Sequence, residues 1–164
     1  MREALLQHFE ALPAPLGVFL IAMLPIFELR GAIPFGYAFG AGNWLEIYLL
    51  AVAGNFVPVL PILLLLGPAE KHLRRFRWID RFLDWLFART MRRSDVIRRY
   101  QAIGVTLFVA IPLPVTGAWT GSVAAYLFKL PLRLTLPCVL LGIMIAGVIV
   151  TLVSQGVITI WSLH

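Results

Sequence analysis

The chain has 164 residues, of which 60% are hydrophobic and only 13% are charged. Soluble domains are about 45–50% apolar and about 25% charged, so this composition excludes an ordinary water-soluble domain and indicates a single integral membrane domain. The formal charge of +6 does not indicate nucleic-acid binding, because ten of the 14 Lys and Arg residues lie within residues 71–99, as in a cytoplasmic segment of a membrane protein.

The first apolar segment, residues 14–42, is interrupted by Pro25, Gly31 and Pro34. The helical arms on either side of the break, residues 15–24 and 33–39, are too short to cross a hydrocarbon core of about 30 Å at about 1.5 Å per residue. The segment is therefore predicted to be either one broken span or a re-entrant hairpin, which enters and leaves the membrane on the same side.

Two charged residues, Glu28 and Arg30, lie beside this break. A charge near the middle of a bilayer costs roughly 2.5–3.5 kcal/mol, so a chain that retains two of them is expected to use them. Residues two apart on a regular helix point in different directions, and we expect unwound backbone between half-helices to let these side chains converge. They would then form either a substrate site or a structural ion pair that holds the break together.

Residues 44–66 are predicted to form a full membrane span that ends at Gly67-Pro68. Asn55, Pro58 and Pro61 lie within this segment. The prolines predict a kink, and the amide is expected to face protein rather than lipid, as a ligand group or as a packing hydrogen bond.

The basic residues then follow in an amphipathic pattern over residues 70–99, with apolar side chains at steps of three and four and basic side chains between them. We expect a helical connector on the cytoplasmic membrane surface. It would fix the topology or bind an anionic lipid or a partner.

A second apolar segment, residues 102–128, is broken by Pro112, Pro114 and Gly117. Thr116 and Thr120 add hydroxyl groups near this break, and they would either cap the broken backbone or donate to a ligand. A new half-helix is expected to begin near residue 118, and a second full span is predicted over residues 132–155.

The order of features is the same in both halves: short arm, proline break, Gly-Ala, second arm, long span. If the basic connector and the link at Lys129 and Arg133 are both cytoplasmic, residues 102–128 must return to the side from which they entered. The fold is therefore predicted to be all-α: an inverted repeat of two re-entrant helical hairpins and two long transmembrane helices. The first repeat covers residues 1–67, the connector 68–100 and the second repeat 101–164.

Two sequence motifs carry a resemblance to a known family. Pro25-Ile-Phe-Glu-Leu-Arg-Gly-Ala-Ile-Pro34, together with Ile111-Pro-Leu-Pro-Val-Thr-Gly-Ala-Trp-Thr-Gly121, resembles the small multi-drug export protein family, which is similar to the wider DedA superfamily. The resemblance implies two facing re-entrant hairpins, the movement of lipids such as polyprenyl phosphates, and a bacterial or archaeal inner-membrane location. It also implies that Glu28 and Arg30 are the charged hairpin positions.

The expected function is therefore a transporter or lipid translocase, with the alternatives of an exporter of cationic amphiphiles or a membrane scaffold. Arg30 offers a planar fork that suits a phosphate, and an anion that displaces Glu28 from it would favour protonation of Glu28, which predicts possible proton coupling.

No cofactor, metal or enzymatic activity is expected, since His8, His72 and His164 show no ligand spacing. Two spans enclose little space, so a homo-oligomer, most simply a dimer, is expected. The predicted substrate-binding residues are Glu28, Arg30, Gly31, Asn55, Thr116, Gly117 and Thr120, and the predicted helix-breaking residues are Pro25, Pro34, Pro112 and Pro114.

Overall fold

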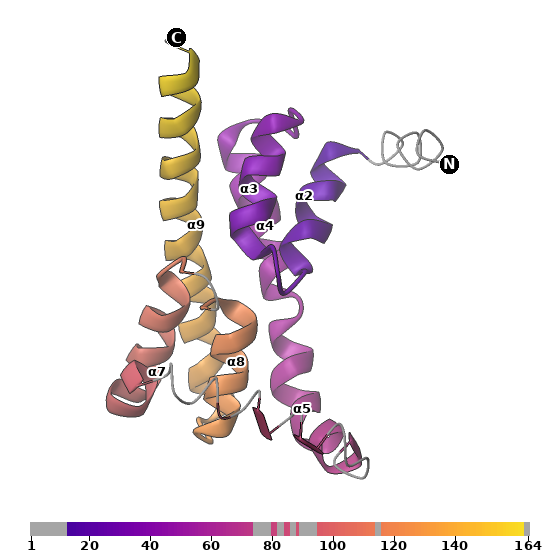
Figure 1. Ribbon diagram of the computed structural model, residues 1–164, viewed down its shortest axis with the longest axis vertical. Helices are drawn as coiled ribbons and strands as arrows, with labels where there is room; N and C mark the ends of the chain where they lie inside the picture. The colour runs from indigo at the N-terminus through magenta and orange to yellow at the C-terminus, as the bar shows by residue number, and fades with distance from the viewer. Residues whose placement is uncertain are drawn as a thin grey trace. The chain divides into compact units, whose positions relative to one another are not determined.

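The computed structural model describes residues 13–73, 80–81, 84–85, 88, 95–113 and 116–162. Within these ranges the regular structure is entirely helical, which confirms the predicted all-α class (Figure 1). The helices are α2 (Ala14–Met23), α3 (Glu28–Ala38), α4 (Trp44–Phe56), α5 (Val59–Leu73), α7 (Asp95–Ala110), α8 (Ala118–Leu127) and α9 (Leu132–Ser162).

The chain divides into two compact units. The first contains residues up to Asn55 together with the chain from Gly147 onward, and the second contains Phe56–Ala146. The first unit therefore holds α2, α3, α4 and the end of α9, and the second holds α5, α7, α8 and the start of α9. The predicted boundaries of the two repeats, after residues 67 and 100, concern sequence repeats and stay predictions.

Two helical segments are long and apolar enough to cross a membrane, Trp44–Pro68 with 25 residues and Leu132–Val157 with 26. They agree with the two spans predicted from the sequence. The first is interrupted at residues 57–58, between α4 and α5 and next to Pro58, where the sequence predicts a kink. Large apolar side chains lie on the exterior of both spans, as lipid contact requires. Examples are Leu64, Leu65, Leu152 and Val153.

A reciprocal capping interaction fixes the start of α4. The side-chain oxygen of Asn43 accepts hydrogen bonds from the N–H groups of Leu45 and Glu46, at 3.0 and 3.1 Å. In return the Glu46 carboxylate accepts from the N–H of Asn43 at 2.9 Å. This capping box satisfies N–H groups that have no partner inside the helix. Capping of α4 therefore accounts for the presence of the charged Glu46 in an apolar segment.

Each unit contains a pair of short helices joined by a break, α2 with α3 and α7 with α8, and both pairs are in contact (Figure 1). Glycines allow the close approach: a Cβ atom on Gly17 would lie 2.8 Å from the ring of Phe35, and one on Gly36 would lie 2.9 Å from Val18. In the second unit Gly142 of α9 lies against Val109 of α7. Small residues at helix contacts are the usual packing device in membranes.

One boundary prediction was wrong. The arm after the first break begins at Glu28 and not at Ile33, because Gly31 continues the helix and Pro34 is accommodated in its interior. The apolar span ends at Pro68, as predicted, while helix α5 continues to Leu73 with Pro68 inside it. A proline within a helix removes one N–H donor without necessarily ending the helix.

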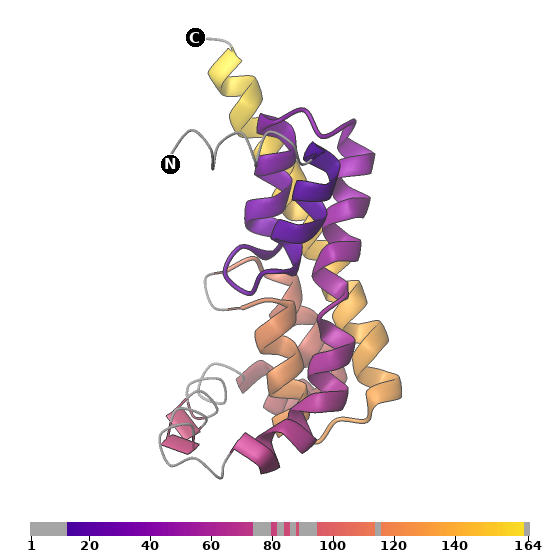
Figure 2. The same ribbon diagram turned by 90° about the vertical axis from the view of Figure 1, so that its right-hand side faces the viewer.

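Figure 2 shows the same helices from the side. Most of the predicted amphipathic connector over residues 70–99 lies outside the described residues, as does Pro114.

Candidate functional site

The break between α2 and α3 is a tight turn over residues 24–27. Leu24 leaves the helical conformation, and its carbonyl then accepts from the N–H groups of Phe27 and Glu28 at 3.2 and 3.0 Å. Pro25 lies in this turn, as predicted, and it cannot supply an N–H to continue α2. Local hydrogen bonds thus satisfy two N–H groups of the break, as a segment inside a membrane requires.

Glu28, the first residue of α3, combines two unfavourable features. Its side chain is buried, with 5% of the residue exposed, and its backbone has φ of 45°. A non-glycine residue in this left-handed region carries strain of about 1–3 kcal/mol, which proteins retain mostly at functional positions. A carboxylate in the first turn of a helix is stabilised by the positive end of the helix dipole.

Arg30 lies close to Glu28 although both belong to one helix. Arg30 Nη2 is 3.9 Å from Glu28 Oε2, a distance that makes an ion pair but exceeds that of a hydrogen bond. The side chain of Arg30 is 29% exposed, against 7% for that of Glu28. The sequence predicted unwound backbone at this position, and the structure has a single left-handed residue, Glu28, at the start of α3, where the carboxylate and the guanidinium lie close together.

The other two predicted residues of the first unit have different surroundings. Gly31 packs against Phe27, since a Cβ atom at Gly31 would lie 2.8 Å from that of Phe27. Asn55 is 1% exposed in the last turn of α4, and its Oδ1 has no hydrogen-bond partner within the described part of the chain. A buried amide oxygen without a partner is rare enough to require an explanation, and a bound ligand or water would supply one.

The second break, residues 111–117, is closed by Thr116. Its hydroxyl donates toward the carbonyls of Ile111 and Leu113 at 2.7 and 2.8 Å, and it accepts from the N–H of Leu113 at 3.1 Å. Gly117 precedes α8 with φ of 153°, a conformation that favours glycine. Helix α8 begins at Ala118, as the sequence predicted. The hydroxyl of Thr116 is therefore engaged with the backbone of the break.

Thr120 differs from Thr116 in this respect. Its hydroxyl has one long contact of 3.4 Å with the carbonyl of Gly117. The four predicted residues Glu28, Arg30, Gly31 and Asn55 belong to the first unit, and Thr116, Gly117 and Thr120 belong to the second. Their joint use in one site stays a prediction.

We expect Thr116→Val to lower the free energy of unfolding by about 1–2 kcal/mol, because it removes the hydroxyl that satisfies the broken backbone. Thr120→Val is the matched control and should cost less than about 0.5 kcal/mol. Chemical unfolding of both variants in detergent measures the difference. Equal losses in the two variants would contradict this role of Thr116.

Sequence reasoning missed three polar residues of the first unit: Tyr37, Thr151 and Gln155. Gln155 Nε2 donates to the Tyr37 hydroxyl at 3.0 Å and joins α9 to α3. Thr151 is 6% exposed, and its hydroxyl lacks a partner among the described residues. The sequence did contain a signal for two of them. Thr151 and Gln155 are polar residues four apart in an otherwise apolar span, a spacing that places them on one face of a helix.

One family model matches residues 28–149, which is most of the chain, and the family is described as "Putative small multi-drug export protein". The match begins at Glu28, directly after the first break, and includes the second break. No curated protein and no solved structure matches the chain. The family description and the two apolar spans together indicate a membrane transporter.

Proposed function

This chain belongs to the small multi-drug export protein family, and we propose that it moves an anionic amphiphile across the membrane with Arg30 binding the anionic group. The observation that carries the proposal is the pair at the start of α3, a strained and buried carboxylate 3.9 Å from a part-exposed guanidinium. Strained backbone at a non-glycine residue is found mostly at functional positions, which favours a role of the pair in binding.

The chemistry of Arg30 favours a phosphate-bearing lipid, such as a polyprenyl phosphate, as the substrate. A guanidinium is always protonated and presents a planar fork that binds phosphate through two hydrogen bonds. An anion at Arg30 would compete with the Glu28 carboxylate, and protonation of Glu28 would then relieve the repulsion between the two anions. Substrate binding and proton uptake would be coupled in this way. The resemblance of the motif to the DedA superfamily also favours a lipid.

The second candidate is an exporter of cationic amphiphiles, which the family description favours. A buried carboxylate is a suitable partner for an organic cation, and Arg30 would then hold Glu28 in its ionised form when no cation is bound. The anion transporter requires Arg30 to bind its substrate, whereas the cation exporter does not.

The helix lengths are compatible with a re-entrant arrangement of both helix pairs. Helices α2, α3 and α8 have 10, 11 and 10 residues, or about 15–17 Å each, and α7 has 16 residues, or about 24 Å, so each is shorter than a hydrocarbon core of about 30 Å. We propose that both pairs return to the side from which they enter and that residues 70–99 face the cytoplasm of a bacterial or archaeal cell. The active form would be a homo-oligomer, most simply a dimer.

Substitution of Arg30 tests the proposal against its alternative. Proteoliposomes would be loaded with a nitrobenzoxadiazole-labelled polyprenyl phosphate, and dithionite quenching would measure its movement between leaflets. We expect Arg30→Ala to lower the rate at least about tenfold, since hydrogen bonds to charged groups contribute about 1.5–3 kcal/mol. Arg30→Lys, which keeps the charge but not the fork, should give an intermediate rate.

Ethidium flux in the same vesicles serves as the cation arm of the experiment. If the wild-type protein moves ethidium but not the labelled phosphate, and Arg30→Ala preserves ethidium flux, the anion proposal is wrong. If both fluxes are absent and Arg30→Ala only unfolds the protein, the pair is structural.

A further inference from the structure

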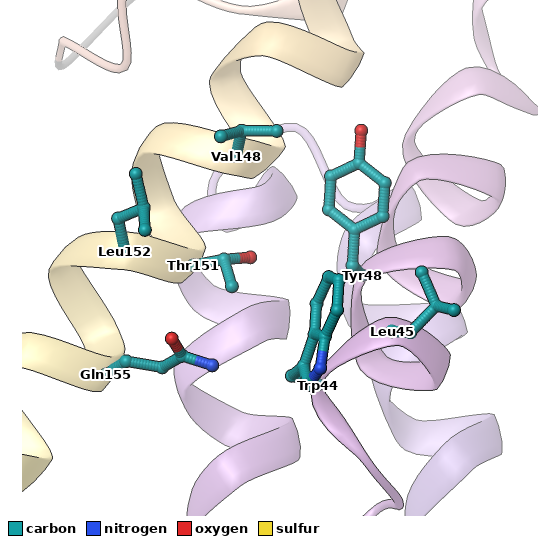
Figure 3. Close-up of a pocket in the computed structure, with 7 residues that line it drawn as sticks. All are labelled: Trp44, Leu45, Tyr48, Val148, Thr151, Leu152 and Gln155. Carbon is teal, nitrogen blue, oxygen red and sulfur yellow. The ribbon is translucent and has the colours of Figure 1, made fainter.

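A pocket lies in the first unit and shares no residue with the Glu28–Arg30 pair. It is open to the exterior, has a volume of about 440 Å³ and lies between the start of α4 and the end of α9 (Figure 3). Its lining residues are Trp44, Leu45, Tyr48, Val148, Thr151, Leu152 and Gln155. We call it the α4–α9 pocket. Its volume lies within the range of about 300–1,000 Å³ that is typical of small-molecule sites.

The walls of the pocket are apolar and aromatic, and no lining residue carries a formal charge. Tyr48 packs closely against Gly147 of α9, where a Cβ atom would lie 2.7 Å from the tyrosine ring. The bond from Gln155 to Tyr37 ties the other end of the pocket to α3. The walls are thus fixed by contacts at both ends, and the lining favours an uncharged ligand.

The hydroxyl of Thr151 distinguishes this pocket from a simple gap between helices. Threonine and serine in helices usually donate to the carbonyl one turn back, as Thr135 does to Pro131 at 3.1 Å and Ser122 does to Ala118 at 2.6 Å. Thr151 has no such bond within the described residues although it is only 6% exposed. Figure 3 shows its oxygen directed toward α4. A buried hydroxyl without a partner lines a cavity that could contain one.

We propose that the α4–α9 pocket binds an uncharged, drug-sized aromatic amphiphile that exchanges a hydrogen bond with Thr151. The two aromatic side chains, Trp44 and Tyr48, offer ring faces and edges for an aromatic ligand. The hydroxyl can donate or accept, so one polar group on the ligand is sufficient. Trp44 is 56% exposed and lies at the rim, where such a ligand would enter from the membrane interface.

This site does not follow from the family description. The matched range ends at residue 149, before Thr151, Leu152 and Gln155. The proposal does not depend on anion transport by Arg30, since binding at the pocket can be measured in a protein that moves nothing.

The test uses the full chain in lipid nanodiscs and the neutral fluorescent probe N-phenyl-1-naphthylamine, with empty nanodiscs as the background. We expect saturable binding by the wild-type protein and a Kd raised about threefold to tenfold in Thr151→Val. Thr151→Ser should restore the wild-type Kd. The probe 1-phenylnaphthalene, which lacks the N–H group, should bind equally to the wild-type protein and Thr151→Val.

A pair of neighbouring substitutions locates the site. Leu152→Trp fills the pocket and should abolish saturable binding, whereas Val153→Trp is the matched control and should leave it unchanged. Leu152 and Val153 have similar exposure, 63% and 60%, but only Leu152 lines the pocket. Near-equal thermal unfolding temperatures for the two variants would show that neither simply fails to fold.

Three results would overturn the proposal. Binding that never saturates above the empty-nanodisc background means that the probe only partitions into lipid. Equal binding by Leu152→Trp and Val153→Trp places the probe elsewhere on the protein. A change in oligomer mass for Leu152→Trp alone, without a change in probe binding, means that a second copy of the chain covers the pocket.

Discussion

Replacing Glu28 by Gln is expected to lower substrate movement in proteoliposomes at least about tenfold and to abolish any accompanying proton flux. The change keeps the shape of the side chain and removes only its charge and its ability to titrate. It also removes the burial of a charge, so the free energy of unfolding should change by less than about 1 kcal/mol. A pH-sensitive dye inside the vesicles records the proton flux while dithionite quenching records the labelled lipid.

Glu46→Gln is the matched control for this experiment. Glu46 belongs to the same unit, but its carboxylate caps α4, and glutamine serves equally well in a capping box. Transport should therefore be unchanged in Glu46→Gln. Wild-type transport and proton flux in Glu28→Gln would contradict the proposed mechanism. A loss of about 3 kcal/mol or more in stability, with transport lost in proportion, would instead identify the pair as a structural clamp.

The second large effect is expected from Gly54, in the last turn of α4. A Cβ atom there would overlap the carbonyl oxygen of Phe19 in α2 and lie 3.0 Å from Cβ of Ala22. Because the obstacle includes backbone, a rotamer change cannot relieve it. We expect Gly54→Ala to lower the free energy of unfolding by about 3 kcal/mol, the upper end of the range for overpacking.

Gly156 provides a control in which the same substitution should raise the free energy of unfolding. It lies in α9, and a Cβ atom there would meet nothing within 4 Å. Gly156→Ala should therefore raise the free energy of unfolding by about 0.5–1 kcal/mol, because alanine is the better helix former. Denaturant titration of both variants under identical detergent conditions measures the pair. Unchanged stability in Gly54→Ala would contradict the packing of α2 against α4, and a loss of stability in Gly156→Ala would contradict the open space beside Gly156.

The long spans were predictable because apolar length and the positions of Trp44, Pro58 and Leu132 are local properties of the sequence. The start of α8 was predictable for the same reason, since Gly117 and the prolines before it restrict the backbone. The start of α3 was not. Continuing the helix through Gly31 and Pro34 depends on packing against α2 and α4, which outweighs intrinsic helix preference and has no local sequence signal.

In the candidate site too, only some features could be predicted from the sequence. The charges of Glu28 and Arg30 stand out in an apolar segment, so the sequence identified them without any knowledge of the fold. The left-handed backbone of Glu28 could not be predicted, nor could the lack of a partner for the Thr151 hydroxyl among the described residues, because each depends on which groups surround the residue in three dimensions. The bonds of Thr116 follow the alternative that the sequence left open, a hydroxyl that caps broken backbone.

The length of α9 has a consequence for the lipid around the protein. Its apolar segment Leu132–Val157 has 26 residues, or about 39 Å of helix, which is about 9 Å more than a hydrocarbon core of about 30 Å. Hydrophobic mismatch of this size is taken up by tilting of the helix or by local thickening of the bilayer. A thick membrane is therefore expected to hold α9 nearly upright, whereas a thin one should incline it.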